Sequence, residues 1–156
     1  MAAAATVPTD RPVLAHDLPT DAEGLLVLRT FELWAHMHDV AQATGRPVPD
    51  LDPPRMALMS ERLMTVLPFA VAMRGNTAPG HTARFVLTGP AGGCYTVPLD
   101  PSQPPGEPDT TIVVDTTELC RLAARRLAVA DLPVTIEGDA ELAARVLASA
   151  DALAKD

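Results

Sequence analysis

Glu32 and His36 lie four residues apart, and they have the spacing that most favours chemistry in this chain. Side chains at positions i and i+4 of a helix share one face, so a carboxylate oxygen and an imidazole nitrogen at this spacing can bind one metal ion. Asp39 lies three residues beyond His36, where it can accept a hydrogen bond from the imidazole and orient it. The alternative is that Glu32 and His36 are ordinary solvated neighbours on a helix.

A helix over residues 21–44 must position this pair. Thr20 or Asp21 is a suitable N-cap, and Gly45 is placed to end the helix. The apolar residues extend beyond a single stripe: Leu25, Leu28, Phe31 and Trp34 mark one side, and Leu26, Val27 and Leu33 widen it. A helix with so wide an apolar surface needs neighbours on more than one side. We therefore interpret residues 20–45 as one member of a helical bundle.

The remaining sequence predicts an α+β domain with one mixed sheet over residues 46–156. Pro68 should kink the first helix of this domain or end it early. Residues 1–19 are rich in proline and show no apolar period, so they are expected to form a disordered leader. The expected elements are a helix over 55–73, strands over 84–88, 94–98 and 111–114, a helix capped by Asp115, a strand over 134–137, and a helix capped by Asp139 that runs to about residue 153.

Composition limits the partners and the compartment. The net charge of −8 argues against binding to nucleic acid and to an anionic membrane surface. We find no run of about 18 apolar residues, so no membrane span is expected, and the first residues lack the features of a signal peptide. Cys94 and Cys120 lie outside any Cys-x-x-Cys pattern and are too few for a disulfide framework. These features favour a reduced, cytoplasmic setting.

Arg29, Glu32, His36 and Asp39 follow one another at intervals of three, four and three residues. This pattern resembles the last bundle helix of the mycothiol-dependent maleylpyruvate isomerase family, which belongs to the DinB-like metal-binding bundles. The likeness covers residues 18–150. It continues through Gly45-Arg46-Pro47, Leu67-Pro68, Phe85-Val86-Leu87-Thr88-Gly89-Pro90, Gly92-Gly93 and Ile136-Glu137-Gly138-Asp139.

The resemblance implies a metal-binding bundle followed by an α+β domain similar to sterol carrier proteins. It makes Glu32 and His36 ligands of a divalent metal, zinc foremost, together with a histidine on an earlier helix that nothing in this chain matches. Mycothiol would be the thiol cofactor, and the reaction would convert maleylpyruvate to fumarylpyruvate. Arg125 is the closest match to an arginine that assists with the anionic substrate, although Ala124 replaces the glycine that precedes it in the family.

Three functions remain open. The chain resembles the C-terminal portion of a metal-binding isomerase or thiol transferase, incomplete unless a second copy or a partner chain completes the bundle. Alternatively, it is a non-catalytic module that binds a small ligand or a protein, or a degenerate member of the family. The substrate expected in the first case is a small anion.

Overall fold

The computed structural model describes residues 8, 10–15, 18–48, 51–89 and 91–154. The chain divides into two compact units, Met1–Val48 and Pro49–Asp156.

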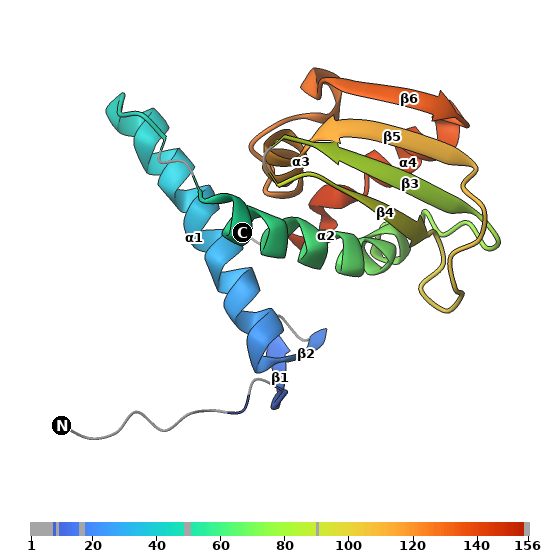
Figure 1. Cartoon of the computed structure of the whole chain (residues 1–156), viewed down its shortest axis with the longest axis horizontal. Coiled ribbons are helices and arrows are strands. Elements are labelled where there is room, and N and C mark those ends of the chain that lie inside the picture. Colours follow the sequence, from blue (N-terminus) through green and yellow to red (C-terminus); the bar gives the residue numbers. More distant parts are fainter. Residues whose placement is uncertain (1–7, 9, 16–17, 49–50, 90, 155–156) are drawn as a thin grey trace. The chain divides into compact units, whose positions relative to one another are not determined.

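The first unit contains a two-stranded antiparallel sheet and a long helix. Strands β1 (Pro12–Ala15) and β2 (Leu18–Asp21) precede helix α1 (Ala22–Thr44) (Figure 1). The carboxylate of Asp21 accepts a hydrogen bond from the backbone N–H of Gly24 at 2.7 Å, which confirms the predicted N-cap. Gly45 ends α1 in the left-handed conformation, at φ 64°, as predicted.

The two strands correct the prediction of a disordered leader for the residues they contain. Pro12 is the first residue of β1 and Pro19 lies in β2, in a sheet where both strands are edges. Proline is tolerated at strand starts and on edge strands, where its missing N–H breaks no ladder bond. The prolines therefore did not exclude a β structure. Residues 1–7, 9 and 16–17 of the predicted leader lie outside the described residues.

The second unit is an α+β domain, which confirms the predicted fold class. Its elements in chain order are α2 (Pro53–Met73), β3 (Thr82–Thr88), β4 (Gly93–Pro98), β5 (Thr110–Asp115), α3 (Thr116–Ala123), the 3₁₀ helix η1 (Val129–Asp131), β6 (Val134–Gly138), α4 (Ala140–Leu147) and the 3₁₀ helix η2 (Ala150–Leu153). The predicted caps are confirmed, because Asp115 accepts the N–H of Thr117 and Asp139 accepts the N–H of Leu142.

The sheet is mixed, with strand order β4-β3-β5-β6 (Figure 1). The hairpin β3–β4 is antiparallel, β5 lies parallel to β3 on its other side, and β6 closes the sheet antiparallel to β5. Phe85, Leu87, Ile112 and Val114 are buried, while their neighbours in sequence are exposed or half-buried. This alternation shows that the helices of the domain cover one face of the sheet.

Helix α2 reaches the predicted end at Met73 and does not end early at Pro68. The proline itself is buried. The last predicted helix is shorter than expected, since α4 ends at Leu147 and η2 follows it. By length and mean hydropathy alone, α2 is also able to cross a membrane, which the sequence analysis did not anticipate. Half of that window is buried inside the structure, and core helices of soluble proteins share this property, so the observation is weak support for a span.

Candidate functional site

The predicted metal ligands lie on α1, and each contacts a side chain three residues away on the same helix. Arg29 Nη1 forms an ion pair with Glu32 Oε2, and His36 Nδ1 lies 3.4 Å from Asp39 Oδ2. The His36 side chain is 71% exposed. Asp39 thus holds the position that the sequence analysis proposed for orienting the imidazole, which leaves Nε2 as the nitrogen for a metal.

These ligands do not make a complete zinc site in the described part of the chain. A catalytic zinc ion takes three protein ligands, and Glu32 and His36 supply two. Among the described residues, no group of three or more His, Cys, Asp or Glu side chains is arranged to hold a metal ion. The metal expected from the resemblance therefore needs at least one ligand from outside the described residues.

Arg125 occupies an unusual backbone position at the end of α3. Its φ is 59°, and no other non-glycine residue among those described has a positive φ. The N–H of Arg126 donates to the carbonyl oxygen of Arg121 at 2.8 Å, and the N–H of Arg125 donates to that of Leu122 at 3.0 Å. This pair of hydrogen bonds is the Schellman motif, and Arg125 holds the position that glycine usually takes.

Two other helices of the chain end in the same way, but with glycine. Gly45 after α1 and Gly75 after α2 both adopt positive φ, at 64° and 69°. Arg46 and Asn76 then donate to the carbonyl oxygens of Ala41 and Val71, as Arg126 does to Arg121. A side chain in this conformation costs on the order of 1 kcal/mol, and such strain is concentrated at functional sites. The departure from glycine at Arg125 therefore favours a role for its side chain.

Asp151 on η2 lies between two arginines. Arg74 Nη2, at the end of α2, donates to Asp151 Oδ1 at 2.7 Å, and Arg125 Nε lies 3.5 Å from Asp151 Oδ2. The first contact has the length of a charge-assisted hydrogen bond, and the second is a longer ion pair. All three side chains are between 34% and 43% exposed, so water reaches them.

A cavity of about 560 Å³ opens beside Arg125 and Asp151. This volume is within the range of small-molecule sites. The residues that line the cavity include two arginines, two aspartates and several apolar side chains. The guanidinium of Arg126 also donates a hydrogen bond to the carbonyl oxygen of Ala124. Its lining consists of Leu122, Arg125, Arg126, Leu127, Ala128, Val129, Asp131, Leu147, Ala148 and Asp151.

The sequence analysis identified Arg125 but missed Arg74 and Asp151. These two residues are 77 positions apart, and no local motif links them. Only the packing of α2 against the C-terminal segment brings them together. A signal was present at Arg125 itself, because an arginine stands where a helix end calls for glycine.

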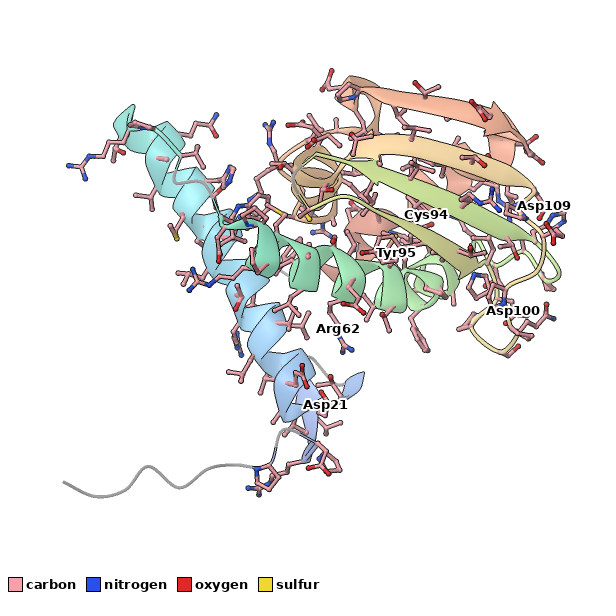
Figure 2. All side chains as sticks on the ribbon, in the orientation of Figure 1. Asp21, Arg62, Cys94, Tyr95, Asp100 and Asp109 are labelled. Carbon is pink, nitrogen blue, oxygen red and sulfur yellow. The ribbon has the colours of Figure 1, made fainter. Side chains whose placement is uncertain are left out.

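A second cavity, of about 350 Å³, lies beside His81 in the loop before β3. The His81 side chain is 49% exposed. Its Nδ1 lies 3.2 Å from Asp109 Oδ1, and Asp109 Oδ2 accepts the N–H of Thr82 at 2.8 Å. That backbone hydrogen bond, opposed by partial desolvation and aided by His81, lowers the pKa of Asp109. Figure 2 shows Asp109 at the end of the sheet.

The two cysteines have opposite surroundings. Cys120 is fully buried on α3, and burial, with the charge of Asp115 adding to it, raises the pKa of its thiol to about 12. Such a thiol is protonated and inert near neutral pH. Cys94 is exposed on β4, where Figure 2 shows it next to Tyr95.

Comparison of the chain with protein-family models, with curated proteins and with solved structures gives no match. The likeness to the maleylpyruvate isomerase family and to sterol carrier proteins therefore rests on the sequence motifs alone and stays a prediction.

Proposed function

We propose that the α+β domain binds a small carboxylate in the cavity beside Arg125. The observation that carries this proposal is the left-handed backbone of Arg125, which places an arginine at the cavity at a cost in stability. Guanidinium groups pair with carboxylates through charge-assisted hydrogen bonds, and Arg126 adds a second guanidinium to the lining of the cavity. The apolar part of the lining suits a ligand with a hydrocarbon portion.

In the fuller form of the proposal, this domain is the substrate-binding part of a mycothiol-dependent isomerase or thiol transferase that acts in the cytoplasm. The ordered match of Arg29, Glu32, His36 and Asp39 supports that form. The incomplete zinc ligands restrict it, because the missing ligand must then come from outside the described residues. No described residue is assigned to mycothiol.

The second candidate is a small-ligand module without catalysis. It is favoured by the ion pair between Arg29 and Glu32, which already gives the Glu32 carboxylate a counterion within the same helix. Both candidates require the same carboxylate site, so binding can be tested before activity.

The test uses hexanoate as a probe and hexanamide as a neutral ligand of equal length. Binding is followed by NMR in the wild type and in Arg125→Gln, through backbone amides of residues 122–129 and through arginine Nε–Hε signals. We expect hexanoate, but not hexanamide, to shift these signals in the wild type, and the effect to be lost in Arg125→Gln. Equal shifts with both probes, or no loss in the variant, would refute the carboxylate site.

A further inference from the structure

The contacts of Asp151 place a carboxylate of the protein itself at the proposed ligand site. Arg125 and Asp151 both line the cavity, whereas Arg74 does not. Asp151 Oδ1 is held by Arg74 at 2.7 Å, while Oδ2 approaches Arg125 only to 3.5 Å. The carboxylate therefore binds tightly to the arginine outside the cavity and loosely to the arginine inside it.

We propose that Asp151 competes with the ligand carboxylate for the guanidinium of Arg125, and that the hydrogen bond from Arg74 to Asp151 weakens this competition. This inference rests on the proposed carboxylate site. A ligand carboxylate replaces Asp151 at Arg125, and Asp151 keeps its hydrogen bond to Arg74. No charge is left without a counterion in the exchange, because each guanidinium ends with one carboxylate.

The position of the C-terminal segment does not depend on this ion pair alone. Asn76 Nδ2 donates to Ser149 Oγ at 2.9 Å, and Ser149 Oγ donates to the carbonyl oxygen of Arg145 at 2.8 Å. Arg145 in turn donates to the carbonyl oxygen of Asn76 at 3.0 Å. These hydrogen bonds tie the end of α2 to α4 and to the start of η2 independently of Arg74 and Asp151. Variants at those two positions are therefore expected to fold.

Competition predicts opposite effects of the two single variants on hexanoate affinity. Asp151→Asn removes the competing charge, and the affinity should rise about two- to fivefold, the range that partly exposed ion pairs allow. Arg74→Gln releases Asp151 to pair fully with Arg125, and the affinity should fall by a similar factor. In the double variant Arg74→Gln/Asp151→Asn, residue 151 no longer carries the competing charge, so Arg74→Gln should have no further effect.

A matched control separates competition from a general change in charge. Asp131 lines the same cavity, and Asp131→Asn removes the same charge. It should change the affinity less than Asp151→Asn does. If Arg74 acted only by attracting anions, Arg74→Gln would also weaken binding in the Asp151→Asn background, and this result would overturn the proposal.

The measurement is the NMR titration with hexanoate in the full chain, read at the Nε–Hε signal of Arg125. A wild type that binds through Arg125, with an Asp151→Asn variant that binds equally or more weakly, would overturn the competitor and leave the carboxylate site standing. Absence of binding in both the wild type and Asp151→Asn would overturn both. Binding seen only after Asp151→Asn would support both.

Discussion

Gly75 and Arg125 hold the same position at the ends of α2 and α3, the residue in left-handed conformation inside a Schellman motif. Their φ values, 69° and 59°, are nearly equal. Glycine adopts this conformation without a steric penalty, whereas a residue with a Cβ atom does not. The difference between the two helix ends is therefore a difference in side chain at a fixed backbone geometry, and it can be tested directly.

Arg125→Gly should stabilise the fold while removing the proposed ligand site. Relief of the left-handed strain should raise the free energy of unfolding by about 0.5–1 kcal/mol, reduced by loss of the exposed contact with Asp151. Arg125→Ala is the matched control, because it loses the guanidinium and keeps the Cβ atom. The free energies of unfolding of wild type, Arg125→Gly and Arg125→Ala are compared by unfolding in urea. If Arg125→Gly is no more stable than Arg125→Ala, the positive φ carries no strain.

Asp109 should contribute more to stability when it is ionised than when it is protonated. Two hydrogen bonds join Thr82 and Asp109. The backbone N–H of Thr82 donates to Asp109 Oδ2 at 2.8 Å, and the backbone N–H of Asp109 donates to the carbonyl oxygen of Thr82 at 2.9 Å. The pKa of Asp109 is lowered in the folded state, chiefly by the first of these bonds. A lowered pKa stabilises the fold above the unfolded value, about 3.9 for aspartate, and this contribution is lost as the pH falls through the folded pKa.

The matching experiment compares wild type with Asp109→Asn from pH 7 to pH 3. The variant should be less stable at pH 7, and the difference should shrink as the pH falls below about 4. Asp131→Asn, for which no such bond to a neighbouring strand is present, serves as the control. A difference between wild type and Asp109→Asn that stays constant over this range would contradict the assignment.

The two thiols should differ in reactivity. Cys94 is exposed, whereas Cys120 is fully buried with its pKa raised to about 12. Because the thiolate is the reactive form, Ellman's reagent at pH 8 should label one thiol per native chain and two in denaturant. Cys94→Ser should abolish the native reaction. Rapid labelling of Cys120 in that variant would show that α3 opens readily.

Sequence reasoning located most of the fold because the local signals agree with the packing. Asp21, Asp115 and Asp139 are caps in the sequence and in the structure, and the alternating apolar residues around Phe85 lie on the buried face. Pro68 does not end α2 early, because tertiary packing keeps the helix continuous through a residue that breaks isolated helices. Only part of the candidate site could be predicted from the sequence, because the hydrogen bond from Arg74 to Asp151 depends on contacts between distant segments.

Zinc should bind weakly to the chain and only through α1. Glu32 and His36 supply two ligands, and the Glu32 carboxylate already has a counterion in Arg29. Calorimetric titration should therefore give weak binding to wild type and none to His36→Ala. Binding should also weaken in acid, because a protonated imidazole is not a ligand. His81→Ala, a histidine in the other unit, is the control. Equal binding by wild type and His36→Ala would exclude the metal role of this pair.

A regular row of side chains on α1 predicts association between chains. Of the wide apolar surface that the sequence predicts for α1, Leu25, Leu28, Phe31 and Trp34 are half-buried or buried. Leu26, Leu33 and Val40 are instead 65%, 62% and 62% exposed. They recur every seven residues, with Thr30 and Met37 between them, which is the spacing of a coiled-coil seam.

The row predicts that two copies of the chain pair through α1, and one charged residue should prevent it. Leu33→Glu places a carboxylate in the centre of the seam, where pairing would bury it without a counterion. Gln42→Glu is the matched control, because it adds the same charge to an exposed position of α1 outside the row. Sedimentation velocity over a range of micromolar concentrations should show a dimer for wild type and Gln42→Glu, and a monomer for Leu33→Glu. If the wild type is monomeric throughout, or if Leu33→Glu still dimerises, α1 is not the interface, and a second copy cannot supply the missing zinc ligand through this helix.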